Sequence, residues 1–505
     1  MRHPRSAAGD PAGSPADRGI PHAPRVPRLA RIRRGAQICR IHRTHRTHRI
    51  SRPAGAASRS LARIRPLPAP RAPLAAAGAL ALVLATTPGA PALTGAPLPA
   101  TPSPAACALP VADGHEAHGG LNEAIPLPAA GGAPAYGGPD SGSAAPSGYA
   151  PTTGTVLALT LFIDFPGSEA TLSTHERFAE FFPATTHYFA DSSGGHLRYQ
   201  PVPVHRWLRM SQPFEAYGID RGTGWYPDDP QGYNRLMGEI VAALAGEVDF
   251  AAYDLVNVLA TPEAGPPATE KVLSVTFPGR PLVPTPSGPL RNVSFIWSHQ
   301  PGESPHRVLV HENGHAFGLP DLYWTGTGSA LPLTGHWDVM EQDWGPSNDL
   351  LAWHKWKLGW LDLTEVACVR YAGVTEFVVG PTDGDAADGG GDDGVALVAV
   401  RTGEHSAVAI EVRAPGGLDQ VVCRPGVLVS WVSSETPSGF GPVRVADATP
   451  DSDGCQDDPH PQVTAGLTDA PFVPGEVFRD DDAGVSVEVL AAEPDGEYRI
   501  RVSRW

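Results

Sequence analysis

Two histidines and a glutamate lie in one short segment with the spacing of a metal site. His311 and His315 stand four residues apart, and Glu312 follows the first of them. On a helix, residues four apart project from one face, so both imidazoles can reach a single ion. Glu312 stands beside them, where a carboxylate can take a proton from an attacking water. Chance alone gives a chain of this composition roughly 0.03 such His-Glu-x-x-His matches.

The following residues extend the pattern to a third ligand. Gly318 permits a sharp turn after the histidines, because glycine adopts backbone conformations that other residues avoid. Asp321 then completes three protein ligands and leaves a fourth position for water, as in a catalytic rather than a structural zinc site. Requiring both residues lowers the expected number of chance matches to roughly 0.0002. We therefore predict His311, His315 and Asp321 as zinc ligands and Glu312 as general base.

A methionine, Met340, follows the histidine motif. Met340 lies nineteen residues beyond Asp321 in a chain with four methionines. A long His-Glu-x-x-His motif followed by such a methionine is typical of metzincin metallopeptidases. We expect Met340 to form an apolar floor beneath the metal and not to bind it.

The elements that must position these residues can be predicted from local signals. Ser304 is a good N-cap, Pro305 suits the first helical position, and Gly318 and Pro320 form a stop, which predicts a helix over 305–317. Upstream, helices and strands alternate in an α/β pattern, with strands over 156–163, 255–260, 272–277 and 293–298 and helices over 174–182 and 233–245. After about residue 363, short β-rich runs predict a sandwich-like C-terminal domain, at 396–400, 407–412, 427–432, 485–490 and 498–502.

These motifs together resemble a known family. Residues 311–323 (HENGHAFGLPDLY), 337–340 (WDVM) and 353–361 (WHKWKLGWL) are similar to the immune inhibitor A type (M-six) of secreted bacterial metallopeptidases. Residues 162–166 and 188–195 are similar to it too. The resemblance implies a metzincin-like zinc peptidase domain of α/β type, with endopeptidase activity on proteins or peptides and with the ligands and base named above.

The chain departs from that family in two ways. The region before Thr155 is short and low in complexity compared with the pro-domain that such enzymes often have. No tyrosine closely follows Met340, so Tyr323 becomes the candidate for a hydroxyl that stabilises the transition state.

Charge and composition divide the chain. The first 71 residues hold 17 Arg, no Lys and two Asp, whereas the rest carries 21 basic and 52 acidic residues. The acidic balance argues against nucleic-acid binding. We interpret residues 1–73 as a basic disordered head, or as sequence upstream of the true translation start. Residues 74–92 have the apolar run and small residues of a signal peptide, and the apolar run itself, residues 74–85, is shorter than a membrane span. We therefore expect a secreted monomer without a stable membrane anchor.

Between the signal and the predicted peptidase domain lies a segment of simple composition. From residue 86 to 150, 40 of 65 residues are Ala, Gly or Pro. Such a composition buries too little apolar surface to offset its ordering entropy. We interpret 93–154 as a linker or short pro-segment, 155–364 as the peptidase domain and 365–505 as the β-rich domain.

The cysteines agree with export. Four of the five lie beyond the basic head, an even number that suits an oxidising exterior. Three connectivities are open. We favour Cys423 with Cys455, because this pair closes a local loop in one β-rich region, and then Cys107 with Cys368.

Two acidic loops, 383–393 and 447–458, can bind Ca²⁺ through oxygen ligands. Neither has the spacing of an EF-hand, and plain loops are the favoured interpretation.

Two alternatives to the catalytic site remain open. In the first, the chain is a secreted binding protein with a structural or degenerate zinc site, and its β-rich domain performs the binding. A closed structural site would need a fourth protein ligand, for which His306, His336 and His354 are the candidates. A thermolysin-like site would instead take Glu341 as the third ligand in place of Asp321. Hydrolysis of an unfolded protein discriminates the enzyme from the binding protein.

Overall fold

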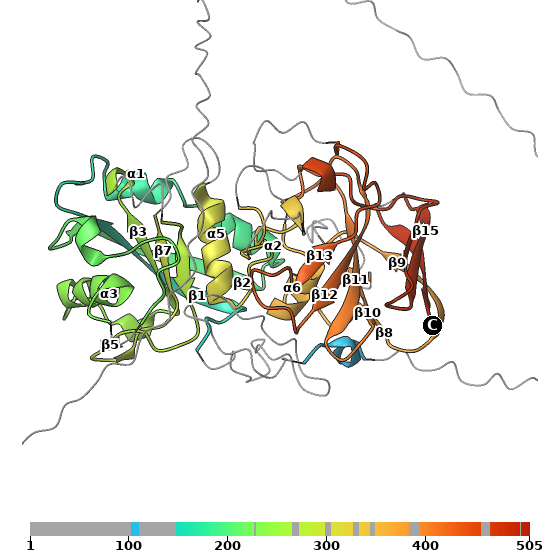
Figure 1. The fold of residues 1–505 in the computed structure, drawn as a ribbon, viewed down its shortest axis with the longest axis horizontal. Helices are drawn as coiled ribbons and strands as arrows, with labels where there is room; N and C mark the ends of the chain where they lie inside the picture. Colours follow the sequence, from blue (N-terminus) through green and yellow to red (C-terminus); the bar gives the residue numbers. More distant parts are fainter. Residues whose placement is uncertain are drawn as a thin grey trace, which may run out of the picture. The chain divides into compact units, whose positions relative to one another are not determined.

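The computed structural model describes residues 103–110, 148–226, 229–264, 272–297, 305–326, 333–343, 349–382, 394–455, 465–494 and 496–505. All of them lie within residues 93–505, which form one unit of the chain. Figure 1 shows a mixed α/β region that is followed along the chain by mainly antiparallel β-sheets. The predicted head and signal segment lie outside the described residues.

The α/β region is built on a five-stranded sheet with the order β2-β1-β3-β7-β4. Its strands are β1 (Gly154–Asp164), β2 (Leu197–Arg209), β3 (Leu255–Ala260), β4 (Val275–Phe277) and β7 (Val293–Ile296). β4 lies at an edge and is antiparallel to β7, whereas the other neighbours are parallel. The four strands predicted for this region are therefore present, with β4 and β7 shorter than expected.

Helices cover both faces of this sheet (Figure 1). They are α1 (Thr174–Ala179), α2 (Ala184–Ser192), α3 (Gly232–Ala243) and α5 (Pro305–Ala316). Alternate residues of β1 point to opposite faces. Ala158 and Phe162 belong to the apolar cluster that contains α2 and α5 side chains, whereas Leu159 and Leu161 belong to the cluster that contains α3 side chains. The continuous apolar run that predicted β1 is thus explained by burial on both sides.

The sequence patterns missed β2, the longest strand of the sheet. It contains Pro201 and Pro203 and shows no continuous apolar run, and many of its residues are partly or fully exposed. Proline is tolerated here because β2 is an edge strand. The helix predicted over 174–182 also ends early, at Ala179.

The C-terminal part contains two further sheets. The first has the order β13-β12-β11-β10-β8, with only β8 and β10 parallel, and the second has the antiparallel order β14-β15-β16-β9. Their strands are β8 (Val366–Val369), β9 (Gly373–Val379), β10 (Leu397–Arg401), β11 (Ser406–Arg413), β12 (Gly426–Ser433), β13 (Val443–Val445), β14 (Val477–Asp480), β15 (Val485–Ala492) and β16 (Tyr498–Arg504). The predicted β-rich character is confirmed.

The first of these sheets is covered on both faces. Val398 and Val400 join a cluster shared with Val487 and Ile500 of the second sheet, which is the packing of a sandwich. On the other face, Ala399 belongs to the same cluster as the α5 side chains. Apolar packing is therefore continuous across the predicted domain boundary between 364 and 365, and that boundary stays a prediction.

Short elements complete the described chain. They are β5 (Pro284–Thr285), β6 (Gly288–Pro289), α6 (Ala352–Leu358) and the 3-10 helices η1 (Pro104–Cys107), η2 (Phe214–Tyr217), η3 (Phe250–Ala252), η4 (Pro262–Ala264), η5 (Gly335–Trp337) and η6 (Ala465–Leu467). No helix among the described residues is long and apolar enough to cross a membrane.

Residues 103–110 lie in the predicted linker but are packed into the protein. Cys107 is fully buried and forms the predicted disulfide with Cys368 on β8. Arg401 on β10 donates hydrogen bonds to the carbonyl oxygens of Ala106 and Ala108 at 3.3 and 2.8 Å. The disulfide and the Arg401 hydrogen bonds attach residues 103–110 to β8 and β10, which the Ala/Gly/Pro-rich composition alone did not predict.

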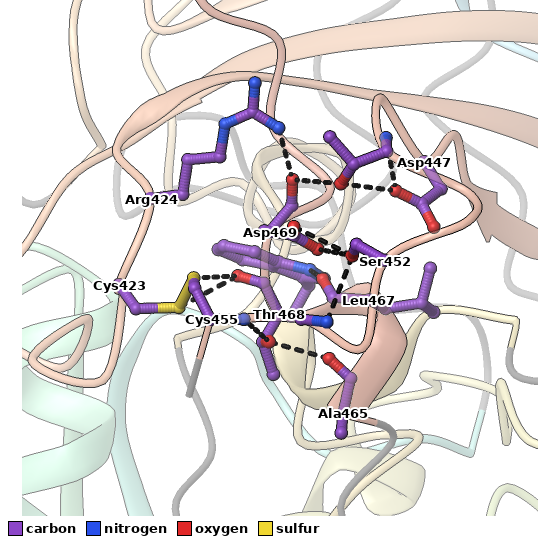
Figure 2. Close-up of a disulfide and its surroundings, with 12 residues drawn as sticks. Cys423, Arg424, Asp447, Ser452, Cys455, Ala465, Leu467, Thr468 and Asp469 are labelled. Carbon is purple, nitrogen blue, oxygen red and sulfur yellow. Dashed lines mark hydrogen bonds between the residues drawn. A yellow bond between two sulfur atoms is a disulfide. The ribbon is translucent and has the colours of Figure 1, made fainter. Parts of the chain in front are cut away.

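The second predicted disulfide, Cys423–Cys455, is also present. Figure 2 shows it beside Thr468, whose hydroxyl accepts a hydrogen bond from the Cys455 amide at 3.0 Å. Asp447, from one of the two acidic loops, accepts a bond from the Thr449 amide at 2.8 Å. Among the described residues these acidic groups form no cluster able to hold a metal. The other loop, 383–393, lies outside the described residues.

Candidate metal centre

The predicted histidine-bearing helix is α5, and most of it is buried. It begins at Pro305, as predicted, and ends at Ala316, one residue early. The predicted N-cap, Ser304, lies outside the described residues. α5 packs on β4 and β7 and against α2. His311 and His315 therefore project from one face of a helix that the core holds in place.

A sharp turn after α5 returns the chain to the histidines. Gly318 has a φ of +91°, a left-handed conformation that favours glycine. Its amide donates to the carbonyl oxygen of His315 at 2.8 Å, and the Leu319 amide donates to that of Gly314 at 2.9 Å. These bonds satisfy carbonyl groups at the helix end. The turn brings Asp321 back to the histidines, as the spacing predicted.

The three predicted ligand atoms meet in one buried group. Oδ1 of Asp321 lies 3.2 Å from Nε2 of His311 and 3.3 Å from Nε2 of His315. The three atoms all lie within 4.8 Å of one another, and within the described chain they form the only such group found. A tetrahedral ion with bonds of about 2.0–2.1 Å separates its ligand atoms by about 3.3–3.4 Å. The two separations between Asp321 and the histidines therefore suit one small ion.

Hydrogen bonds on the far side of each ring orient the two imidazoles. Nδ1 of His311 lies 2.9 Å from the carbonyl oxygen of Val339, and Nδ1 of His315 lies 2.9 Å from that of Leu319. Because a carbonyl oxygen only accepts, Nδ1 carries the proton, and Nε2 keeps its lone pair in the neutral ring. Metal-binding histidines are commonly oriented in this way. The group can hold a metal ion.

The charges around the group favour a cation. Burial lowers the pKa of His311, but the hydrogen bond that its ring donates to Asp321 and the charges of Asp343, Asp321 and Glu312 outweigh burial and raise this pKa to about 10. Burial raises the pKa of Asp321, yet the charge of His315 and the hydrogen bonds with both histidines hold it well below its usual range. The carboxylates thus stabilise positive charge at His311, and a bound metal ion would supply positive charge at the site.

Glu312 lies in the same buried site. Its Oε2 accepts a hydrogen bond from the hydroxyl of Thr276 on β4, at 2.7 Å. Burial raises the pKa of Glu312, and the charges of His315 and His311 oppose this effect. A carboxyl group that is held in place and whose pKa is raised is suited to accept and return a proton.

Met340 lies against α5 and is fully buried. Gly314 packs on it so closely that a Cβ at position 314 would lie 2.5 Å from the Met340 sulfur. The carbonyl oxygen of Met340 accepts from the Leu322 amide at 3.1 Å, next to Asp321. The burial of Met340 and its contact with Gly314 agree with its predicted role as apolar packing, and its place beneath a metal stays a prediction.

Tyr323 lies beside the group. Its ring stacks on His311 with 6.0 Å between centroids, and its side chain hydrogen-bonds to Asp321. Burial raises the pKa of Tyr323 well above its ordinary value, and the charges of Asp321 and Glu312 raise it further. The hydroxyl therefore stays protonated and able to donate. Its role with a substrate stays a prediction.

The alternative ligands lie elsewhere. None of His306, His336, His354 and Glu341 belongs to the metal-holding group. Nδ1 of His354 lies 2.8 Å from Oδ2 of Asp338, and Glu341 accepts hydrogen bonds from backbone amides. Among the described residues, then, no fourth His, Cys, Asp or Glu joins the group, and the geometry favours Asp321 over Glu341 as the third ligand.

Three residues of the site were not identified from the sequence. They are Thr276, which bonds the predicted base, Ser438, which bonds Asp321, and Asp343, whose charge acts on the histidines. Asp343 stands three residues past Met340, and this proximity was the one available signal. No motif marks Thr276 or Ser438.

No protein-family model matches the chain, and neither does any curated protein. The geometry therefore carries the functional argument.

Proposed function

We propose that the chain is a secreted zinc-dependent endopeptidase of the immune inhibitor A type, with a metzincin-like peptidase domain. One observation carries the proposal: Glu312 shares a buried site with the ligand atoms of His311, His315 and Asp321. The Met340 packing and the turn at Gly318 support it. The two disulfides support an oxidising, extracellular location.

Two imidazoles and one carboxylate form a donor set typical of catalytic zinc. The same set holds iron(II) in some oxygenases. Zinc is favoured here because both histidines stand on one helix with a glutamate between them that is suited to general base chemistry. Calcium and magnesium prefer oxygen ligands alone, so this site does not suit them.

The residues present can perform each proton transfer of peptide hydrolysis. When bound, a zinc ion lowers the pKa of water toward roughly 7 and polarises the substrate carbonyl. Glu312 accepts the proton of the attacking water and returns it to the leaving amine. Thr276 holds the Glu312 carboxyl group during both transfers. Tyr323, whose hydroxyl hydrogen-bonds to Asp321 in the free protein, would turn that hydrogen toward the negative charge that develops on the substrate oxygen.

The test is hydrolysis of casein by residues 93–505, with and without a zinc chelator, and by the Glu312→Ala variant. We expect the chelator to abolish cleavage and added zinc to restore it. Glu312→Ala should retain one zinc per chain but lose about 100-fold or more in rate, because general acid–base catalysis contributes about 10²–10⁴-fold. Cleavage by this variant at a near wild-type rate would contradict the proposal.

The same experiment addresses the binding-protein alternative. A wild-type protein that binds one zinc and cleaves nothing would favour that alternative, or a latent form that requires removal of residues 93–150. Metal analysis of the Asp321→Ala and Glu341→Ala variants separates the ligand sets, because only the first should lose zinc.

A further inference from the structure

A turn from the C-terminal sheets reaches the third predicted ligand. It comprises residues 434–442, between β12 and β13. The hydroxyl oxygen of Ser438 accepts a hydrogen bond from the Asp321 amide at 2.9 Å, and the Gly439 amide donates to the Asp321 carbonyl oxygen at 2.9 Å. This turn therefore holds the backbone of Asp321 on both sides, from 117 residues further along the chain.

The two carboxylate oxygens of Asp321 face different neighbours. Oδ1 lies 3.2 and 3.3 Å from the Nε2 atoms of His311 and His315. Oδ2 lies 3.4 Å from the hydroxyl of Ser438, which donates to it. A carboxylate that binds a metal through one oxygen is oriented by hydrogen bonds to the other. Ser438 thus contacts both the backbone and the side chain of the predicted ligand.

The turn is itself fixed against the segment that carries Asp321. The carbonyl oxygen of Gly439 accepts hydrogen bonds from the amide and hydroxyl of Thr325, at 2.7 and 3.0 Å. Gly439 has a φ of +76°, and a Cβ there would clash with the Thr325 side chain. Beside it, the rings of Trp324 and Phe440 meet edge to face at 5.3 Å between centroids. Ser438 is therefore held at a defined place beside the site.

We propose that Ser438 is a positioning residue for Asp321, and that the turn 434–442 thereby contributes to metal binding at the site. The inference rests on the proposed function in one respect, namely that the site binds zinc. It assigns to the β-rich part of the chain a direct role in metal affinity, which a separate accessory domain would not have.

The experiment compares Ser438→Ala with Ser438→Thr and with the control Ser434→Ala. Ser434 belongs to the same turn, and its hydroxyl lies 3.0 Å from Nδ1 of His405. For each full chain, the zinc dissociation constant is measured by competition with a chromophoric chelator. Thermal unfolding of the metal-free chains reports stability, and the visible absorption of the cobalt(II) forms reports ligand geometry.

Loss of a residue that orients a ligand typically weakens metal binding about 10–100-fold. We expect Ser438→Ala to weaken zinc binding about 10-fold and to change the cobalt spectrum. Ser438→Thr should restore both, and Ser434→Ala should leave both unchanged. If Ser438→Ala binds zinc as tightly as wild type, or if Ser434→Ala weakens it equally, the inference is wrong.

These results remain separable from the proposed function. A wild-type chain that binds zinc but does not cleave casein defeats the proposed function, and the comparison of the serine variants still decides the role of Ser438. A wild-type chain that binds no zinc overturns both proposals.

Discussion

Asn313 holds α5 to the sheet from a position between the predicted base and the second histidine. Its side-chain oxygen accepts from the Tyr199 hydroxyl at 2.7 Å, and its amide nitrogen donates to Asn257 at 2.9 Å and to Ser294 at 3.1 Å. Asn257 in turn donates to the Tyr199 hydroxyl at 2.8 Å. All four residues are buried. The network therefore ties α5, which carries the two predicted histidine ligands, to β2, β3 and β7.

Removing the Asn313 side chain should destabilise the protein strongly. Asn313→Ala leaves buried polar groups without their partner, at a cost of about 1–3 kcal/mol for each such group. We expect the free energy of unfolding of the metal-free chain to fall by about 2–4 kcal/mol, measured by urea denaturation. Tyr199→Phe and the double variant complete a cycle, in which the two losses should not add. Additive losses would show that the network does not act as a unit.

At the residue scale, sequence patterns predicted the residues whose spacing is local and missed those whose contacts are distant. His311, Glu312, His315 and Asp321 lie within eleven residues, so helix periodicity and one glycine turn relate them. Ser438 reaches Asp321 only because β12 and β13 fold back onto that loop. No local pattern carries such a contact, which depends on tertiary packing.

At the element scale, helix α6 buries two lysines in different ways. Lys355 forms an ion pair with Asp349, and both side chains are almost fully buried. Lys357 is 4% exposed, and burial lowers its pKa from 10.5 to about 7. One amine is therefore compensated by a carboxylate, whereas the other is destabilised in its charged form.

Replacing each lysine by methionine should change stability in opposite directions at pH 7. Lys355→Met leaves Asp349 without its cation, and breaking a buried ion pair costs about 3–5 kcal/mol. Lys357→Met removes an amine whose charged form is disfavoured by burial in the folded chain. We expect this variant to raise the free energy of unfolding by about 1–3 kcal/mol, since each pKa unit corresponds to about 1.4 kcal/mol. Urea denaturation of both variants measures the two effects.

The pH dependence provides the check on Lys357. Its pKa is lower in the folded chain, so between about pH 7 and pH 10 the unfolded chain binds more protons at this residue. Its contribution to wild-type stability therefore becomes more favourable as pH rises through this window. The advantage of Lys357→Met should shrink accordingly between pH 7 and pH 10. An advantage that stays constant over this range would contradict the lowered pKa.

The elements that could be predicted share strong local signals. β1 and β3 are short apolar runs, and α5 has a proline start and a glycine stop. β2 and β9 could not be predicted in the same way, because β2 contains two prolines and no continuous apolar run, and β9 is a short strand of mixed polar and apolar residues that is mostly exposed. These strands depend on their pairing partners, β1 and β16, and not on their own pattern.

At the scale of the whole molecule, a buried arginine connects the β-rich part to the chain that leads into α6. Arg413 on β11 forms ion pairs with Glu411 and Asp419. It also donates to the carbonyl oxygens of Asp349 and Leu350, at 3.1 and 3.3 Å. The predicted peptidase and β-rich segments therefore share polar contacts as well as an apolar cluster. We expect the two segments to unfold together.

The two disulfides should stabilise this unit unequally. Cys107–Cys368 joins residues 261 positions apart, whereas Cys423–Cys455 joins residues 32 apart. In the chain-entropy model the longer closed loop restricts the unfolded chain more, by about 2 kcal/mol for these lengths. The longer link also holds residues 103–110, where Cys107 and Leu109 are buried. Both the loop length and the attachment of residues 103–110 should make Cys107–Cys368 the more stabilising disulfide.

We therefore expect replacement of Cys107 and Cys368 by serine to cost about 2 kcal/mol more than the same replacement of Cys423 and Cys455. Urea denaturation of the two double variants, with the remaining disulfide intact, measures the difference. Zinc affinity serves as a second readout, because α5, which carries the predicted histidine ligands, packs in the same apolar cluster as Cys107. The affinity should be unchanged if the replacement affects only the unfolded state. Equal losses of stability would show that the ordering of residues 103–110 adds little, and that the long loop is already restricted in the unfolded chain.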